Sequence, residues 1–229
     1  MTIDCPHCQA SVLLRPEEAL PETPPPELPP KNEAKFSQFQ TSDGEIFGQF
    51  SKSPNKDYTL VWSDRWICGQ SKSGGPFYLF HNGKEICKGK IERPNDGSVA
   101  NNGNFIFCDW LFSQELESIF YAFNYRGETI IKQKLDANLL NAALSDDGLY
   151  AACQTATNDD GYYSDTLLAF DLKSCKEIWH SAPPFRAENY TFDTQKLELA
   201  IRGTSPIYRS CILTLVPPPP KKRKAKRPV

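Results

Sequence analysis

The chain has 229 residues, with 26 basic and 28 acidic side chains, 19 prolines, eight cysteines and three histidines. This length accommodates one domain with its own core, together with short appendages. Because 39% of the residues are hydrophobic and aromatic residues are frequent, wholesale disorder is excluded.

The net charge of −2 averages over three unlike segments. Residues 1–34 carry two basic and six acidic groups, residues 35–216 carry 18 and 22, and residues 217–229 carry six basic groups and no acidic group. An acidic body repels the phosphates of nucleic acids. Any nucleic-acid binding is therefore expected to use the basic C-terminal segment.

The first residues, MTIDCPHCQASVLL, have an acidic side chain, no basic flank and only a short apolar run, which does not fit a secretory signal. No stretch of the sequence reaches the roughly 20 apolar residues of a membrane span. We therefore expect a cytoplasmic protein, or a nuclear one in a eukaryote, without membrane association. In a reducing compartment its cysteines are expected to be thiols or metal ligands, not disulfides.

Cys5 and Cys8 form a CPHC motif, in which two thiolates on a tight turn can hold one Zn²⁺. With the surrounding ITxCPxCxA pattern, the segment resembles the first half of a short bacterial-type zinc ribbon, which implies zinc at these two cysteines. The second CxxC of such ribbons is absent. His7, Cys68 or Cys87 would have to complete the shell, or two chains would share a four-cysteine site; the alternative is a degenerate ribbon without metal.

Proline divides the chain, because seven prolines lie within residues 16–30 and five within residues 217–228. Proline-rich segments are stiff and extended. The predicted organisation is a knuckle at 1–15, a linker at 16–34, a folded body at 35–216 and a disordered tail at 217–229.

Within the body, short runs of aromatic and β-branched residues are separated by Gly, Asn and Asp, and helical periodicity is absent. The body is therefore predicted to be all-β. The principal predicted strands are 58–62, 77–80, 105–108, 119–123, 129–131, 149–153, 167–170, 197–201 and 207–215.

Two sequence elements recur with the same period. The first follows a polar turn, and its aligned members lie 47, 45 and 47 residues apart: Tyr58, Phe105, Tyr150 and Leu197. The second lies in a later strand, and its members are 44 and 48 residues apart: Ile86, Ile130 and Ile178. A period of 40 to 50 residues with about four strands per unit is typical of a β-propeller blade.

The third unit has a Ser-x-Asp-Gly turn at residues 145–148, the aromatic-Asp pair Phe170-Asp171, and a Lys-Glu-aliphatic-Trp sequence at 176–179. This unit is similar to the repeats of WD-repeat and TolB-like β-propellers, and the resemblance covers about 175 residues of the chain. It implies a β-propeller-like fold with about four four-stranded blades, of the kind that binds partners on a face of the ring.

The fourth unit lacks an outer strand before the prolines begin at Pro217. The segment Lys35–Thr41 is expected to supply that strand and to close a four-bladed ring within one chain. The alternatives are a half-ring that dimerises into eight blades and an open β-sandwich.

Candidates for chemistry are few, and no catalytic residue is predicted. Cys108 and Cys153 occupy one position of the repeat alignment and are interpreted as buried packing residues. His81 and His180 are the only histidines of the body, so a triad is not indicated. The acidic residues of the third unit are interpreted as solvated turn residues that make Asx-type hydrogen bonds, in preference to Ca²⁺ ligands. They are Asp146, Asp147, Asp159, Asp160 and Asp165.

Trp66 and Trp110 follow charged residues near strand ends and are the candidates for contact with a partner protein. The tail resembles a nuclear localisation signal and is a polycation able to bind nucleic acid or an anionic partner. Its basic residues are Lys221, Lys222, Arg223, Lys224, Lys226 and Arg227.

The leading prediction is a non-enzymatic scaffold that uses a small β-propeller to bind a macromolecule, with a protein as its partner and a homodimer as an open alternative. The second hypothesis is a nucleic-acid-associated accessory protein that binds through the knuckle and the tail. The third is an enzyme that uses the funnel of the propeller. No cofactor other than zinc is predicted.

Overall fold

A computed structural model describes residues 2–4, 11–13, 36–64, 74–159, 161–203 and 211–216. These residues form 18 β-strands and no helix, so the prediction of an all-β body is confirmed. Among them, no helix has the length and hydropathy needed to cross a membrane.

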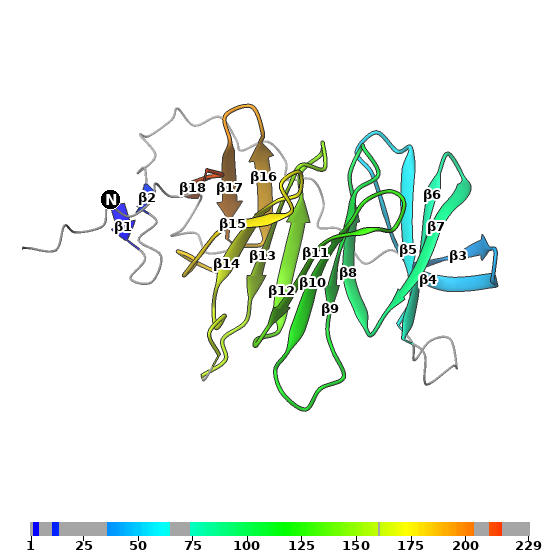
Figure 1. Ribbon diagram of the computed structural model, residues 1–229, viewed down its shortest axis with the longest axis horizontal. Coiled ribbons are helices and arrows are strands. Elements are labelled where there is room, and N and C mark those ends of the chain that lie inside the picture. Colours follow the sequence, from blue (N-terminus) through cyan, green and yellow to red (C-terminus); the bar gives the residue numbers. More distant parts are fainter. Residues whose placement is uncertain are drawn as a thin grey trace, which may run out of the picture.

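Four antiparallel sheets follow one another along the chain, and we call them blades 1 to 4 (Figure 1). Blade 1 contains β3 (Phe36–Thr41), β4 (Gly44–Lys52), β5 (Tyr58–Trp62), β6 (Gly75–His81) and β7 (Lys84–Ile91). Blade 2 contains β8 (Pro94–Val99), β9 (Phe105–Asp109), β10 (Ser118–Phe123) and β11 (Thr129–Leu135). Blade 3 contains β12 (Leu139–Leu144), β13 (Tyr150–Thr155), β14 (Leu167–Asp171) and β15 (Lys176–Ser181). Blade 4 contains β16 (Asn189–Asp193), β17 (Glu198–Arg202) and β18 (Cys211–Thr214). A separate hairpin pairs β1 (Thr2–Asp4) with β2 (Ser11–Leu13).

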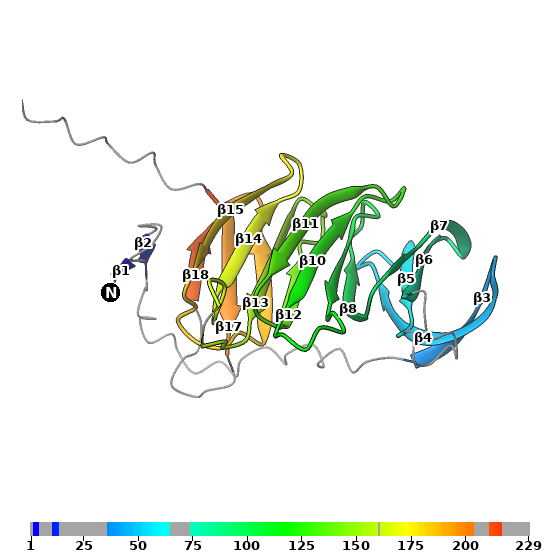
Figure 2. The same cartoon turned by 60° about the horizontal axis from the view of Figure 1, so that its bottom comes forward.

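The blades stand face to face in a row, with blade 1 and blade 4 at opposite ends in both views (Figures 1 and 2). One apolar cluster fills each space between successive blades. A sheet that is covered on both faces needs continuous apolar runs instead of alternation. The strand β9 meets this requirement, because all five of its residues are buried. The repeated sheets make the fold β-propeller-like, as the repeat spacing predicts.

The outer face of blade 1 is covered by the blade's own first hairpin. Figure 2 shows β3 and β4 bending around this side of the sheet. Phe39 of β3 packs on Phe50 and Phe80 over a small apolar cluster. The β3–β4 turn is tied to β7, where Lys88 Nζ lies 2.6 Å from Asp43 Oδ1.

The expectation that residues 35–41 close a ring is therefore wrong, because β3 pairs with β4 over its whole length and not with blade 4. The physical reason is the apolar face of blade 1. Phe39 gains more buried contact on that face than it would on a distant sheet edge.

The second repeated element is confirmed at single-residue level. Each of Ile86, Ile130 and Ile178 is the unpaired residue of a β-bulge between the last two strands of its blade. A bulge bends the strand and increases its twist. The same irregularity at the same place in three blades shows that these units are structural repeats.

The first repeated element is shifted in two units. A backbone hydrogen bond closes each of these turns. In blade 1 Ser53 N–H donates to Tyr58 O, and in blade 3 Ser145 N–H donates to Tyr150 O, so both bonds join residues five positions apart. In blade 2 Ala100 N–H donates to Asn104 O, only four positions away. The turn of blade 2 is therefore one residue shorter, so Asn104, and not Phe105, is equivalent to Tyr58 and Tyr150. In blade 4 the predicted member, Leu197, lies in the turn with a φ of 56°.

The one-residue shift in blade 2 means that Cys108 and Cys153 point to opposite faces of their sheets, because successive residues of a strand point to opposite faces. Cys108 and Cys153 are not equivalent; Cys108 projects from blade 2 toward blade 3, and Cys153 from blade 3 toward blade 2. Both are buried, at 1% and 0% exposure, in the same apolar cluster. Their interpretation as packing residues is confirmed.

Candidate functional site

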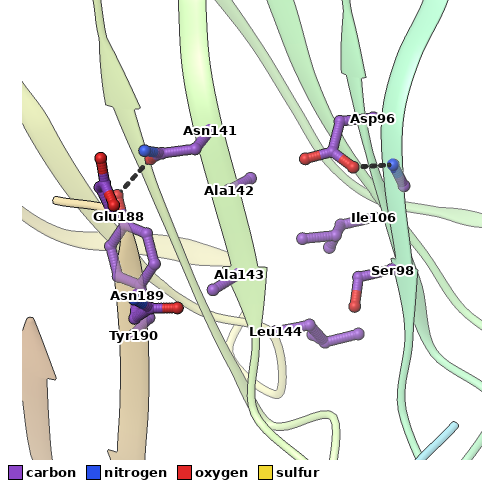
Figure 3. Close-up of a pocket in the computed structure, with 11 residues that line it drawn as sticks. Asp96, Ser98, Ile106, Asn141, Ala142, Ala143, Leu144, Glu188, Asn189 and Tyr190 are labelled. Atoms are coloured by element: carbon purple, nitrogen blue, oxygen red, sulfur yellow. Dashed lines mark hydrogen bonds between the residues drawn. The ribbon is translucent and has the colours of Figure 1, made fainter. Parts of the chain in front are cut away.

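Apart from the covering strand β3, the first strands of the blades are β4, β8, β12 and β16, and they lie along one side of the row. The strand β8 contacts both β4 and β12. A pocket of about 340 Å³ opens between β8, β12 and β16, so that three blades contribute to its walls (Figure 3). Its polar lining residues are Asp96, Ser98, Asn141, Glu188, Asn189 and Tyr190.

Four polar side chains occupy one repeated position on these first strands, and we call them the polar tier. The register pairs Gln49 with Trp62, Asp96 with Cys108, Asn141 with Gln154, and Asn189 with Arg202. In blades 2 and 3 a bulge directly precedes the tier residue. The tier residues lie 47, 45 and 48 positions apart.

Three of the four tier residues line the pocket, namely Asp96, Asn141 and Asn189. Sequence reasoning missed them, although a signal exists. Each is an amide or carboxyl side chain within a short strand, and the three recur at nearly the period found for the turns. Such positions do not stand out among apolar runs.

The Asn141 side chain links blades 3 and 4 by hydrogen bonds at the pocket. Its Nδ2 donates to the carbonyl of Ala187 at 2.6 Å, and its Oδ1 accepts a hydrogen bond from the hydroxyl of Tyr190. The buried Gln154 adds a second tie, because its Oε1 accepts from Ala187 N–H at 2.8 Å. Burial raises the pKa of Tyr190 well above its ordinary value, so this phenol remains a neutral donor at physiological pH.

Asp96 supplies the charge of the opposite wall. One carboxylate oxygen accepts the N–H of Gly97 at 2.9 Å (Figure 3). The side chain reaches solvent through the pocket, but the pocket walls remove part of its hydration, and this desolvation raises its pKa while the Gly97 hydrogen bond opposes the rise. Within the described ranges no cationic side chain is paired with Asp96.

Trp110 makes contacts within the protein. Its ring is partly buried against the cluster between blades 2 and 3, and its Nε1 donates to the carbonyl of Leu139 in blade 3 at 2.9 Å. Contact of Trp110 with a partner stays a prediction. Trp66, Cys5, Cys8 and the six basic residues of the tail lie outside the described residues, so their predicted roles also stay predictions.

The two body histidines lie in different surroundings. His81 is half-buried and stacks on Tyr58, with ring centroids 4.5 Å apart. His180 is half-buried as well, with Nδ1 2.6 Å from Glu177 Oε1 and Nε2 3.1 Å from the hydroxyl of Tyr162. Glu177 orients the imidazole, but the cluster lies away from the residues that line the pocket.

The Asx interpretation is confirmed for Asp147, whose Oδ1 accepts from the Ser145 hydroxyl at 2.7 Å and from Leu149 N–H at 3.0 Å. Among the residues whose positions are described, no group of three or more His, Cys, Asp and Glu side chains is arranged to hold a metal ion. Cys87, a candidate fourth zinc ligand, is buried in the apolar cluster between blades 1 and 2.

No protein-family model matches this sequence, and no curated protein matches it. Several solved structures are similar in fold. The β-propeller domain of Cps50 (Swd1) from Myceliophteria thermophila matches 67% of this chain and 47% of its own, with 12% identity and a TM-score of 0.42. Sqt1 from Saccharomyces cerevisiae matches 72% and 52%, with 11% identity and a TM-score of 0.44.

The periplasmic gluconolactonase PpgL of Pseudomonas aeruginosa matches 77% of this chain and 61% of its own, with 11% identity and a TM-score of 0.43. The chain spans about half the length of the first solved structures that it matches. What this chain's own residues establish is a β-propeller-like row of blades with a polar pocket on the side of their first strands.

Proposed function

We propose that this chain is a non-enzymatic scaffold that binds a segment of a partner protein along β8, β12 and β16, with a lysine or arginine of the partner beside Asp96. The observation that carries the proposal is the carboxylate of Asp96, which faces a pocket built by three blades and has a backbone N–H as its hydrogen-bond partner.

A cationic side chain is the ligand that fits this pocket. A partly desolvated carboxylate is stabilised by an opposite charge within about 4 to 6 Å, and a guanidinium or ammonium group also donates hydrogen bonds to it. Ser98 and Asn189 line the same pocket and supply neutral donors and acceptors for the peptide groups on either side of that side chain. A rigid wall favours such binding, because Asn141 and Tyr190 are already held by hydrogen bonds between blades 3 and 4.

The proposal is tested with two labelled probe peptides that differ at one central residue, arginine in one and its neutral analogue citrulline in the other. Fluorescence anisotropy on the full chain measures the affinity of each. The arginine peptide is expected to bind up to about fivefold more tightly, and Asp96→Asn is expected to abolish the difference, since a charge pair that water reaches is worth up to about 1 kcal/mol.

Asp159→Asn is the matched control, because Asp159 is exposed in a loop of blade 3 and does not line the pocket. It should leave both affinities unchanged. Equal binding of the arginine peptide by the native chain and by Asp96→Asn would contradict the proposed site.

A further inference from the structure

The last blade ends in a strand that lacks a neighbour. Counted from β4, β8 and β12, blades 1, 2 and 3 each end in a fourth strand, namely β7, β11 and β15, whereas the described sheet of blade 4 is β16–β17–β18. Among the described strands none pairs with the outer edge of β18. An unpaired edge presents N–H and C=O groups to any other strand.

The other outer strands carry charged residues that discourage such pairing, and β18 does not. The strand β7 reads KEICKGKI, β11 reads TIIKQKL and β15 begins with Lys-Glu, whereas β18 reads CILT. Lysine on an edge strand opposes the addition of a further strand, because its charge would be desolvated. The edge of β18 therefore has the composition of a strand that is covered.

The groups available on this edge follow from the hydrogen bonds of β18. Leu215 N–H donates to Leu197 O on the side of β17, so by alternation the N–H and C=O groups of Ile212 and Thr214 point to the open side. Trp179 Nε1 of blade 3 donates to Thr214 O at 2.8 Å, which holds the edge in place. The groups that remain for a new strand are the N–H and C=O of Ile212 and the N–H of Thr214, which is enough for a strand of about three residues.

The N-terminal hairpin supplies a strand of that length. The strand β2 has three residues, Ser11–Leu13, and it lies against β18 without being part of its sheet (Figure 2). We propose that β2 pairs with the outer edge of β18 and is the missing fourth strand of blade 4. The N-terminal hairpin is thus the cover of this edge, contributed by the same chain.

The length of the intervening chain permits this assignment. Residues 14–35 separate β2 from β3, which belongs to blade 1 at the far end of the row. These 22 residues can span up to about 70 Å when extended. Sheets pack about 10 Å apart, so the distance from blade 1 to blade 4 is about 30 Å. The hairpin therefore reaches blade 4 of its own chain, and a second molecule is not needed.

Hydrogen exchange measured by NMR on the full chain tests this pairing residue by residue. The amides of Ile212 and Thr214 are expected to be protected. Val12→Pro removes a backbone donor from β2 and should raise their exchange rates at least about tenfold, while the Leu213 amide, which faces β17, keeps its protection. Ala19→Pro, in the proline-rich segment, is the matched control and should change neither rate.

Two results would overturn the proposal. The first is fast exchange of Ile212 and Thr214 in the native chain, or rates that Val12→Pro leaves unchanged. The second is protection that rises with protein concentration together with a dimer in sedimentation, which would assign the edge to a second copy. A monomer whose protection depends on Val12 is the result that the proposal requires.

Discussion

Asp96 is expected to reduce the stability of the fold at neutral pH. Its folded-state pKa is raised, so the folded protein holds the proton more tightly than the unfolded chain does. The stabilisation from this group is complete below the unfolded pKa of about 3.9 and is lost as the pH rises through the folded pKa. Asp96→Asn should therefore raise the Tm at pH 7 and leave it nearly unchanged at pH 3.5.

The gain at pH 7 is expected to stay below about 1 kcal/mol, because water reaches the Asp96 side chain and screens its charge. Differential scanning calorimetry at the two pH values measures it. A lower Tm at pH 7 would show that Asp96 has a stabilising partner. A higher Tm combined with the loss of arginine-peptide binding is the pattern expected of a residue retained for function.

Gly148 is required by the turn between β12 and β13. Its φ is 70°, and a Cβ there would collide with the side-chain amide of Asn102 in the neighbouring turn of blade 2. Gly148→Val is expected to cost about 1 to 2 kcal/mol from the left-handed backbone, and somewhat more because the Asn102 amide has to move and its Oδ1 then loses the Asn104 N–H.

Gly83 is the control for this substitution, because its φ is 78° but a Cβ there would meet no atom within 4 Å. Gly83→Val should show the backbone cost alone. Urea unfolding gives both values. If the two variants were equally stable, the collision between the turns of blades 2 and 3 would not contribute.

Two tryptophan side chains join successive blades through the same kind of hydrogen bond. Trp110 Nε1 donates to Leu139 O between blades 2 and 3, and Trp179 Nε1 donates to Thr214 O between blades 3 and 4. Replacing either by Phe is expected to cost about 1 kcal/mol, because a half-buried carbonyl loses its donor. Only Trp179→Phe should increase hydrogen exchange in β18. An equal increase in β18 from Trp110→Phe would show that each hydrogen bond does not stabilise only the two blades that it joins.

The elements were predictable to different degrees for physical reasons. The spacing of Ile86, Ile130 and Ile178 predicts their equivalence correctly because a bulge recurs at the same place in blades 1, 2 and 3. Phe105 was misaligned by one position because turn length varies between blades, while apolar runs in sheets covered on both faces look the same from either register. Alternation would have revealed the misalignment, but β9, which is buried along its whole length, has none.

The apolar runs of the sequence do not reveal the pocket, because its residues are far apart along the chain and meet only when three blades stack. Asp96, Asn141 and Asn189 are 45 and 48 positions apart, and none belongs to a known motif. The hydrogen bond of Trp110 was equally out of reach, because its acceptor, the carbonyl of Leu139, lies 29 positions along the chain in the next blade. The contact of Trp110 with a partner stays a prediction.

At the scale of the whole molecule, the repeat spacing fixed the number of blades but not how the row ends. Closure of a ring depends on whether β3 buries more apolar surface against the last blade or against the first. The apolar face around Phe39, Ile46 and Phe80 decides this in favour of blade 1. Terminal units of repeat arrays commonly need such a covering element, and here β3 provides it.

A row in which each blade contacts only its neighbours is expected to open from its less protected end. Blade 1 is enclosed by its own hairpin, whereas blade 4 packs on one apolar cluster and has only the proposed short pairing with β2 at its outer edge. Leu199→Ala in blade 4 should therefore release the amides of β16–β18 and leave blade 2 protected. Phe120→Ala, in the cluster between blades 2 and 3, should lower protection in both of those blades.

Both side chains are fully buried, so each truncation is expected to cost about 3 kcal/mol, and the comparison concerns where protection is lost. Hydrogen exchange with mass spectrometry resolves the blades as separate peptides. Equal loss of protection in all four blades after Leu199→Ala would show that the row unfolds as one cooperative unit. Loss confined to blade 4 would show that the stability of the row is a sum over blades and the interfaces between them.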